Sequence, residues 1–297
     1  MTASSTDSED SRRPADGSLL PAPPWRVGAA SWEFREPLIM GVLNATPDSF
    51  SDGGEFLELD AALRRAQAMV SEQADIIDLG GASSHPLAKP VSTEEELGRI
   101  LPIVERLVGN VPLPLSIDTQ KPEVAEACLK LGAQLINDVS GLTDLEMARV
   151  AARHGVPLVV MYNNFALPRA AGGPPLMEAM GEFFATRIAQ AEAEGLTHII
   201  LDPGYGFGKS LQDNMLLLRQ LGQLHGLHRP LLVCTSRKGS LGRITGEKDP
   251  KKRLPGTLVS TLFAVNQGAH MIRVHDVKAI HQAMRTWRAI QQPTPDG

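Results

Sequence analysis

Eight short apolar runs recur along the chain, and longer stretches with the period of an amphipathic helix separate them. The runs predict buried β-strands at residues 38–43, 75–79, 113–117, 134–137, 157–161, 198–201, 230–234 and 270–274. Helices are predicted near residues 59–73, 93–108, 121–131, 143–154, 176–195, 211–224, 255–268 and 276–290. Eight strand–helix units are the count of a closed barrel, so we predict an α/β protein built as a single (β/α)8 TIM barrel.

The main alternative is a doubly wound open sheet, which alternates strands and helices in the same way. Such a sheet requires no particular number of units, and it usually carries a glycine-rich dinucleotide-binding turn after its first strand. The residues after the first predicted strand contain no such turn. A chain of 297 residues would suffice for one large domain or two average ones, and we therefore favour one barrel.

The two ends of the chain differ in composition from the part between them. Residues 1–30 are rich in Ser, Asp, Pro and Ala and resemble neither a secretory signal nor a membrane span, so we predict a disordered N-terminal tail. Residues 291–297 contain two prolines and no apolar period, which predicts a disordered C-terminal tail. The folded barrel is expected over residues 31–290.

Charge and cysteine content limit the partners and the compartment. The net charge of −5 argues against a nucleic-acid partner, because such partners bind basic surfaces, and no membrane partner is expected. Cys128 and Cys234 lie in a predicted helix and a predicted strand, which suits reduced packing residues better than a disulfide framework. We therefore expect a reducing compartment, the cytoplasm.

Polar residues stand at the ends of the predicted strands, where a barrel carries its chemistry. An Asp or Asn at such a place is, taken alone, more often a helix cap or a turn residue than a ligand. Here six or seven loops are expected to point hydrogen-bonding groups at one mouth of the barrel. The residues concerned are Asn44, Asp118, Asn137, Asp138, Asp202, Ser236, Arg237, Lys238, Arg273 and His275.

Two segments resemble the signature motifs of the dihydropteroate synthases. The first reads Leu43-Asn44-Ala45-Thr46-Pro47-Asp48-Ser49-Phe50-Ser51-Asp52-Gly53-Gly54, and the second reads Asp202-Pro203-Gly204-Tyr205-Gly206-Phe207-Gly208-Lys209. Four shorter segments, at residues 116–119, 136–138, 236–238 and 273–276, are similar to the remaining motifs of that family. The resemblance runs from about residue 38 to residue 290 and is specific, because two long motifs in this order rarely arise by chance.

The resemblance implies an alkyl transferase of folate biosynthesis that condenses 6-hydroxymethyl-7,8-dihydropterin pyrophosphate with 4-aminobenzoate. The implied products are 7,8-dihydropteroate and pyrophosphate, formed by departure of pyrophosphate and capture of a pterin cation. A Mg2+ ion and a homodimer packed through the last helices are further expectations from the family. The sequence of residues 255–290 shows no clear exposed apolar stripe that would predict the dimer contact independently.

The functional positions of the family carry over to matching residues of this chain. Pterin binding is implied for Asp118, Asn137, Met161, Asp202, Phe207 and Lys238. Pyrophosphate binding is implied for Asn44, Arg273 and His275, with Asn44 also holding the Mg2+ ion. Binding of 4-aminobenzoate is implied for Thr46, Pro47, Ser84, Phe207 and Ser236. The implied catalytic residues are Asp118, which would stabilise the pterin cation, Lys238, Arg273 and His275.

General chemistry agrees with these roles. A pterin has several adjacent donors, and an unpaired buried polar group costs about 1–3 kcal/mol, so a pterin site needs acceptors at matching positions. Pyrophosphate gains negative charge as its carbon–oxygen bond breaks, so a cation and fixed donors lower the barrier. Because Mg2+ keeps waters and phosphate oxygens as ligands, a single Asn is a sufficient protein ligand.

The loop after the second predicted strand departs from the family pattern. It reads Gly80-Gly81-Ala82-Ser83-Ser84-His85-Pro86, where the family usually has Gly-Gly-Glu-Ser-Thr-Arg-Pro-Gly. Arg is a permanently charged bidentate phosphate ligand, whereas His85 is neutral much of the time near neutral pH, so pyrophosphate binding or loop closure is expected to differ. A Ser-His-Pro at this place is similar to sulfonamide-insensitive members of the family, although the segment after Asp202 lacks an insertion of the kind that those members carry.

Two other functions fit part of the pattern. A methyltransferase that passes a methyl group from a folate to a corrinoid protein would share the pterin-binding acids and amides. It would have no reason to keep Arg273 and His275 for a pyrophosphate. A pterin-binding protein without turnover is the second alternative, and the His at position 85 is the feature that favours it.

Overall fold

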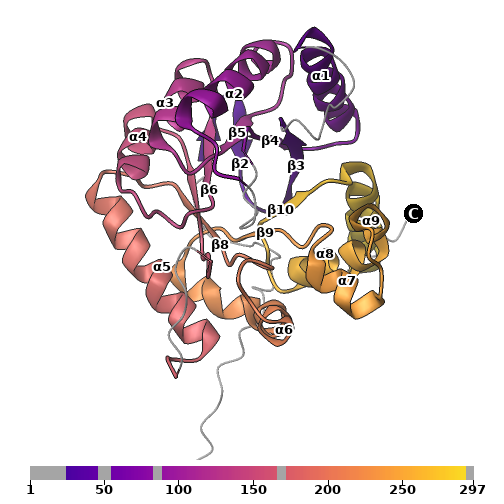
Figure 1. Ribbon diagram of the computed structural model, residues 1–297. Helices are drawn as coiled ribbons and strands as arrows, with labels where there is room; N and C mark the ends of the chain where they lie inside the picture. The colour runs from indigo at the N-terminus through magenta and orange to yellow at the C-terminus, as the bar shows by residue number, and fades with distance from the viewer. Residues whose placement is uncertain (1–24, 46–54, 83–88, 166–171, 292–297) are drawn as a thin grey trace, which may run out of the picture.

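The computed structural model describes residues 25–45, 55–82, 89–165 and 172–291. Eight parallel strands in this part of the chain form one sheet in the order β8-β7-β6-β5-β4-β3-β10-β9. A parallel bridge between Leu201 and Leu231 joins the two end strands, and the Leu201 amide donates to the Pro230 carbonyl at 2.9 Å. The sheet is therefore a nearly closed barrel, which Figure 1 shows with the helices around it.

The strands of the barrel are short and buried, as the apolar runs predict. They are β3 (Leu38–Asn44), β4 (Ile76–Gly80), β5 (Leu115–Asp118), β6 (Leu135–Asp138), β7 (Leu158–Met161), β8 (Ile199–Asp202), β9 (Leu232–Val233) and β10 (Met271–Val274). Each overlaps one predicted run, and all pair in parallel, so their carboxyl ends meet at one mouth. The prediction of a (β/α)8 barrel is confirmed.

The helices of the outer layer also follow the prediction. They are α1 (Glu55–Ser71), α2 (Thr93–Leu107), α3 (Pro122–Lys130), α4 (Glu146–His154), α5 (Leu176–Ala193), α6 (Leu211–Gln220), α8 (Leu254–Asn266) and α9 (Val277–Gln291). The short helix α7 (Gly239–Thr245) and the 3-10 turn η3 (Pro250–Lys252) were not predicted, since each is too short to show an apolar period. The helix predicted at 211–224 ends in a second 3-10 turn, η2 (Leu221–Leu227). None of the described helices is long and apolar enough to cross a membrane.

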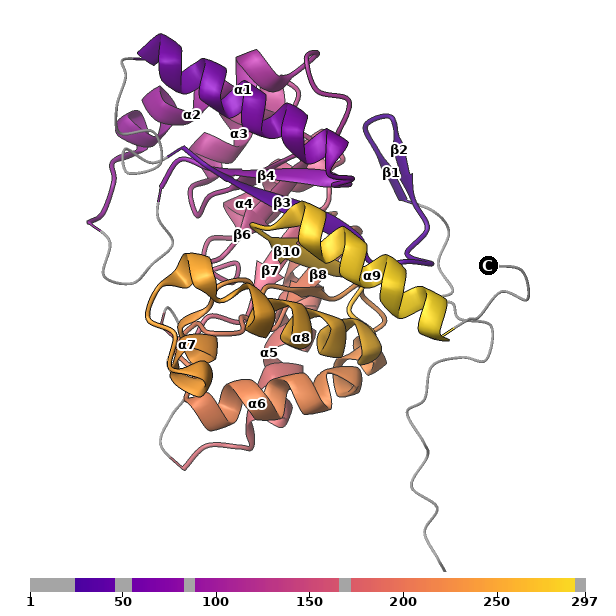
Figure 2. The same ribbon diagram turned by 90° about the vertical axis from the view of Figure 1, so that its right-hand side faces the viewer.

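A β-hairpin before the barrel corrects the expected domain boundary. Its strands are β1 (Trp25–Val27) and β2 (Ala30–Trp32), which pair antiparallel, so residues 25–30 belong to the folded part rather than to a tail. Trp25, Trp32 and Phe34 pack against the apolar side chains inside the barrel. Figure 2 shows the hairpin at the end of the barrel opposite to α7. Residues 1–24 and 292–297, the rest of the predicted tails, lie outside the described residues.

Alternation along the strands divides the barrel interior into two layers. The layer next to the hairpin is apolar and is formed by Met40, Ile76, Leu135, Val159, Ile200, Leu232 and Met271. Side chains two residues apart on a strand share a face, so the next interior layer lies one step nearer to the mouth. In that layer the side chains include Asp78, Asn137, Asp202 and Arg273, all buried or half-buried. The period of the strands thus gathers polar groups at the mouth.

Candidate active site

The floor of the barrel mouth is a network centred on Asp78 of β4. Its Oδ1 accepts a hydrogen bond from Ser116 Oγ at 2.5 Å, and its Oδ2 accepts from Asn137 Nδ2 at 3.1 Å. Arg273 of β10 donates from Nε to the same Oδ2 at 2.6 Å. Asp78 is fully buried, so its charge is balanced by these donors rather than by water.

Arg273 joins two carboxylates of the floor. Besides Asp78, it pairs through a terminal nitrogen with Oδ2 of Asp118 at 2.6 Å. The guanidinium has five N–H donors in a fixed plane, so one terminal nitrogen is left beyond these two contacts. Arg273 and His275 line the same cavity, so this nitrogen has an anion-binding position available.

Two further acceptors complete the floor. The Oδ1 of Asn137 is buried and has no hydrogen-bond partner among the residues that the structure describes. Asp202, at the end of β8, accepts from the Gly204 amide at 2.7 Å through Oδ1. Unsatisfied buried oxygens are rare in folded proteins, so the free oxygen of Asn137 indicates a ligand that brings its own donor.

The loop after β8 is held by Lys209. Its ammonium group donates to the carbonyls of Tyr162 and Gly204, each at 2.9 Å, and to that of Phe207 at 3.3 Å. Gly204 has a φ of 65° and lies against the Tyr162 carbonyl, where a Cβ would come within 2.2 Å, so only glycine fits this turn. The loop places the Phe207 ring 4.1 Å from the ammonium of Lys238, an attractive cation–π contact.

Ser236 and His275 are bonded to each other. The Ser236 hydroxyl lies 2.9 Å from His275 Nδ1 and accepts the His275 backbone N–H at 3.2 Å. Because the hydroxyl oxygen already accepts from the backbone, its own proton is available to Nδ1, which leaves an N–H on Nε2. This tautomer gives His275 one neutral donor, and Ser236 is buried rather than open to solvent.

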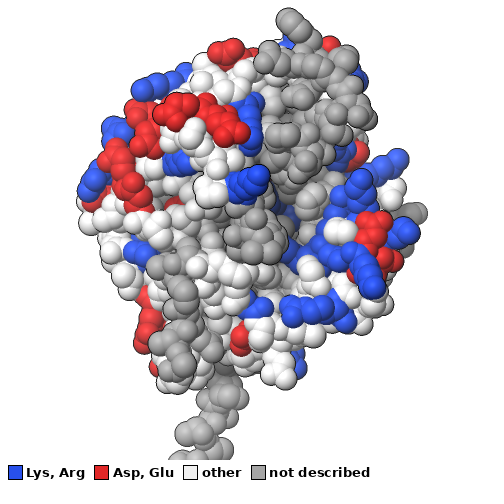
Figure 3. Space-filling view, in the orientation of Figure 1, with Lys and Arg blue, Asp and Glu red and all other residues white. Residues whose placement is uncertain are grey.

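The rim of the mouth is basic although the whole chain is acidic. A cavity of about 1070 Å3 opens there, and its lining holds six basic and three acidic side chains. They are Arg65, Arg237, Lys238, Lys251, Arg273 and Lys278 against Glu72, Asp249 and Asp276. Figure 3 shows basic side chains gathered over the side of α7, α8 and α9, and acidic ones mainly over α2 to α4.

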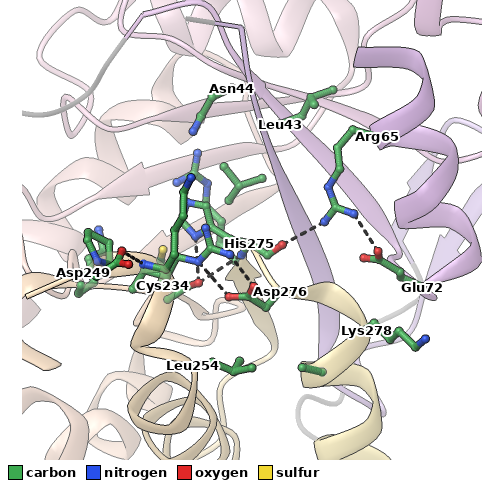
Figure 4. Close-up of a pocket in the computed structure, with 18 of the residues that line it drawn as sticks. Leu43, Asn44, Arg65, Glu72, Cys234, Asp249, Leu254, His275, Asp276 and Lys278 are labelled. Atoms are coloured by element: carbon green, nitrogen blue, oxygen red, sulfur yellow. Dashed lines mark hydrogen bonds and ion pairs between the residues drawn. The ribbon is translucent and has the colours of Figure 1, made fainter. Parts of the chain in front are cut away.

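Two arginines of the rim are fixed by neighbouring groups. Arg237 makes a bidentate pair with Asp276 at 2.5 and 3.0 Å. Arg65 of α1 donates to the His275 carbonyl at 3.0 Å and pairs with Glu72 at 2.8 Å, as Figure 4 shows. These pairs fix the two arginines in place, and the excess of basic over acidic side chains in the lining gives the rim a net positive field for an anionic ligand.

Burial shifts the titration of the central groups. It raises the pKa of Asp118 to about 7, and Asp78 adds to the rise while Arg273 acts against it. It also raises the pKa of Asp202. Burial and the charges of Arg237 and Arg273 lower the pKa of His275 to about 4, so its imidazole is neutral near neutral pH. Groups with such shifts in one cavity are typical of a catalytic site.

The model of the family described as pterin binding enzyme matches residues 40–275. The chain belongs to this family. Its acceptor-rich floor and basic rim are thus those of a pterin-binding enzyme.

Individual pterin-binding enzymes resemble the chain over most of its length. The dihydropteroate synthase of Synechocystis sp. is 42% identical over 275 residues, which are 90% of this chain and 95% of that protein. The structure of Xanthomonas albilineans dihydropteroate synthase with 4-aminobenzoic acid is 39% identical and covers 92% of this chain and 99% of that one, with a TM-score of 0.86. The same enzyme in complex with 7,8-dihydropteroate covers 92% and 100%, at 38% identity and a TM-score of 0.83.

In this pterin-binding enzyme, most residues named from the sequence lie at one mouth. Asn44, Cys234, Ser236, Lys238, Arg273 and His275 line the large cavity. Asp118, Asn137, Met161 and Asp202 are buried on strands of the barrel, and Phe207 lies against Lys238. Thr46, Pro47, Ser84 and His85 lie outside the described residues.

Sequence reasoning missed two buried residues of this pterin-binding enzyme. Asp78 was counted only as part of an apolar strand, although a lone acid inside the run Ile76–Gly80 was a signal that it needs a partner. Lys209 was noted only as a motif residue, and its role as a donor to three carbonyls depends on loop geometry. In contrast, Asp138 faces the turn before α4, where its oxygens accept from the amides of Ser140 and Leu142, each at 2.8 Å.

The fit of a metal ion to the mouth of this pterin-binding enzyme rests on Asn44. The described residues contain no group of three or more His, Cys, Asp or Glu side chains placed to hold an ion. Asn44 ends β3 at the basic cavity, it is exposed, and its carboxamide makes no hydrogen bond to a described residue. An open carboxamide oxygen beside an anion site fits a Mg2+ ion that takes its other ligands from water and phosphate.

Proposed function

We propose that this chain is a dihydropteroate synthase, which joins 6-hydroxymethyl-7,8-dihydropterin pyrophosphate to 4-aminobenzoate and releases pyrophosphate. The observation that carries the proposal is that a buried floor rich in hydrogen-bond acceptors and a basic rim lie together at one mouth of the barrel. The floor suits a flat heterocycle with several donors, and the rim suits its pyrophosphate. The relatives named above support it through their high identity over nearly the whole chain.

The pterin ring is proposed to lie on the floor. The free Oδ1 of Asn137 and the carboxylates of Asp118 and Asp202 supply acceptors for the donors of the ring. Lys238 interacts electrostatically with both acids and supplies a donor for a ring acceptor. Met161 and Phe207 are proposed as apolar walls of the pocket.

The chemistry is proposed to proceed through a pterin cation. The bond between the exocyclic methylene carbon and the pyrophosphate oxygen breaks, and the electron pair leaves with pyrophosphate. The amine nitrogen of 4-aminobenzoate then forms the new bond to that carbon and loses a proton to solvent. The ionised carboxylate of Asp118 stabilises the cation, and its contact with Arg273 favours the ionised form.

The leaving pyrophosphate is proposed to bind at the basic rim. The remaining terminal nitrogen of Arg273 and the Nε2–H of His275 would donate to it, and Lys238 would add a positive charge. A Mg2+ ion held by Asn44 would neutralise part of the charge that develops on the leaving group. Fixed donors of this kind bind the more highly charged transition state more tightly than the ground state.

The aminobenzoate is proposed to lie between Phe207 and Ser236, near the first turn of α7. Because Ser236 is bonded to His275, the carboxylate of the substrate would compete for this hydroxyl or accept from the backbone beside it. Contributions of Thr46, Pro47 and Ser84 are part of the same proposal. A sulfonamide-insensitive pocket, suggested by His85, is a hypothesis that the assay below tests.

A homodimer is proposed through α8. Val259 and Phe263 are exposed to 71% and 39%, although both are large and apolar, and one helical turn separates them. Ile244 of α7, a helix that contacts α8, is exposed to 53%. This face supplies the apolar stripe that the sequence alone did not reveal, and a second copy of the chain would cover it. A cytoplasmic location is proposed because Cys128 and Cys234 are both free and buried.

The test is pyrophosphate release by the purified protein with Mg2+, the pterin pyrophosphate and 4-aminobenzoate. Turnover that needs both substrates is expected. If the protein binds the pterin pyrophosphate without turnover, it is a pterin-binding protein and not a synthase. Methyl transfer from a methylated folate would favour the methyltransferase alternative. A sulfonamide in the assay, compared between wild type and His85→Arg, tests the drug hypothesis: inhibition that appears only in the variant is expected.

A further inference from the structure

Asp78 is the most enclosed charged group of the floor, yet the proposed reaction gives it no task. Its side chain is fully buried, and both of its oxygens are occupied by protein donors from three different strands. With three protein donors on its two oxygens and no exposed surface, this carboxylate does not contact a ligand directly. Any influence of Asp78 on the ligand therefore acts through the groups that it contacts.

The contact with Asn137 decides what that side chain offers to the cavity. A carboxamide has a donor end and an acceptor end, and either can face a given neighbour. Oδ2 of Asp78, which also accepts from Arg273, lies 3.1 Å from one end of the Asn137 carboxamide. An oxygen at that end would place two acceptors against each other, so that end is the NH2 group and the oxygen faces away.

The position of Asp78 is itself fixed. Ser116 holds Oδ1 at 2.5 Å and Arg273 holds Oδ2 at 2.6 Å, so the carboxylate cannot turn to release Asn137. The Asn137 oxygen that faces away is buried and unpartnered within the described part of the chain. Because no described residue supplies a donor to it, a donor on the bound ligand or on a trapped water is the group that we expect to satisfy it.

We propose that Asp78 is a specificity-determining residue that holds the Asn137 carboxamide with its oxygen toward the ligand, so that the site selects a heterocycle with an N–H or amino donor at that point. The proposal rests on the proposed pterin-binding function and deepens it. A ligand with a ring acceptor at the same point would meet the oxygen of Asn137, and we expect it to bind at least about tenfold more weakly.

The proposal predicts an unusual effect of Asn137→Asp. The new carboxyl would lie against the carboxylate of Asp78, and two such groups cannot both be ionised at close range. With a proton, the new carboxyl can still donate to Asp78 and offer its other oxygen to the ligand. Without the proton, repulsion displaces it. Arg273 of β10 and Asp118 of β5 act on Asp78, and Glu96 of α2 and Lys238 act in turn on Asp118.

The experiment measures the affinity of the full chain for 6-hydroxymethylpterin, which lacks pyrophosphate and so reports ring recognition alone. Wild type, Asn137→Asp and the double variant Asp78→Asn/Asn137→Asp are titrated at about pH 5.5 and about pH 7.5. We expect Asn137→Asp to lose about tenfold or more in affinity between the two pH values, beyond any change in wild type. The double variant, which has one carboxyl fewer, should lose this excess pH dependence.

Thermal unfolding without ligand gives a second reading of the same samples. Asn137→Asp should have a lower unfolding temperature than wild type at the higher pH, and the double variant should regain most of this loss. A variant that unfolds at the higher pH therefore still tests the contact between residues 78 and 137. Equal pH dependence in wild type and Asn137→Asp, or an excess that persists in the double variant, would overturn the proposal. Failure of wild type to bind the pterin would instead overturn the proposed function.

Discussion

Asp118 and Asp138 are both buried at the ends of adjacent strands, but they face opposite sides of the barrel wall. Asp118 points inward to Arg273, whereas Asp138 points outward to two backbone amides. We expect Asp118→Asn to lower kcat/KM by about 10- to 100-fold, because a hydrogen bond to a charged group is worth about 1.5–3 kcal/mol. Steady-state pyrophosphate release measures this loss.

Asp138→Asn is the matched control for that substitution. It makes the same chemical change in a buried aspartate, but it weakens only the turn before α4. We expect its free energy of unfolding in urea to fall by about 1–3 kcal/mol while kcat/KM of the folded protein stays near that of wild type. A large loss of kcat/KM in Asp138→Asn, or none in Asp118→Asn, would contradict the assignment of Asp118.

His275 predicts a pH dependence of stability. Its pKa is lowered from 6.5 to about 4, so between these values the unfolded chain binds a proton that the folded protein does not. Stability from this group is therefore fully present above about pH 6.5 and is lost as the pH falls toward 4. We expect wild type to lose on the order of 2 kcal/mol more than His275→Gln between about pH 7 and pH 5 in urea unfolding. Parallel losses in the two proteins would refute this.

At the scale of elements, the loop after β8 depends on one buried cation. Lys209→Met removes the donor of three carbonyls and so frees the segment that carries Phe207. We expect KM for 4-aminobenzoate to rise at least about tenfold and stability to fall by about 1–3 kcal/mol, measured by initial rates and urea unfolding. Tyr205→Phe, which removes only the 2.8 Å bond with Ser240, should have a smaller effect on both.

The hairpin before β3 contributes stability without contributing to the site. Phe34 is 3% exposed and packs edge-on to Trp25 with ring centroids 5.2 Å apart. We expect Phe34→Ala to lower the free energy of unfolding by about 3–5 kcal/mol and to leave KM for both substrates unchanged, because it acts at the far end of the barrel. Phe165→Ala, at a residue that is 50% exposed, is the control and should change stability little.

At the scale of the whole molecule, the exposed face of α8 predicts the assembly state. We expect wild type to sediment as a dimer and Val259→Asp to sediment as a monomer, because a buried unpaired charge opposes association. Ile290→Asp places the same charge at an equally exposed apolar residue of α9 and should leave the dimer intact. A monomeric wild type at micromolar concentration would show that this face is covered by something else or by nothing.

The sequence by itself determined the barrel, because its evidence is local. The eight strands and the helices between them can be recognised from the spacing of apolar side chains along the chain alone. The ends of the strands follow from the same spacing. Asn44, Asp118, Asn137, Asp202, Lys238 and Arg273 were found because each lies in or shortly after the end of such a run and matches a motif. The hairpin at Trp25 was missed, since its strands of three residues are too short for any period.

Only the tertiary structure decided how these residues act on one another. Asp78 and Arg273 are 195 positions apart, and they form an ion pair only because β10 lies beside β3 and β3 beside β4. The orientation of Asn137, the three bonds of Lys209 and the exposed face of α8 likewise arise from contacts between distant segments. The local sequence shows which residues form a strand and which of its faces is buried. Which side chains meet inside the barrel is set by the pairing of the strands and the closure of the sheet.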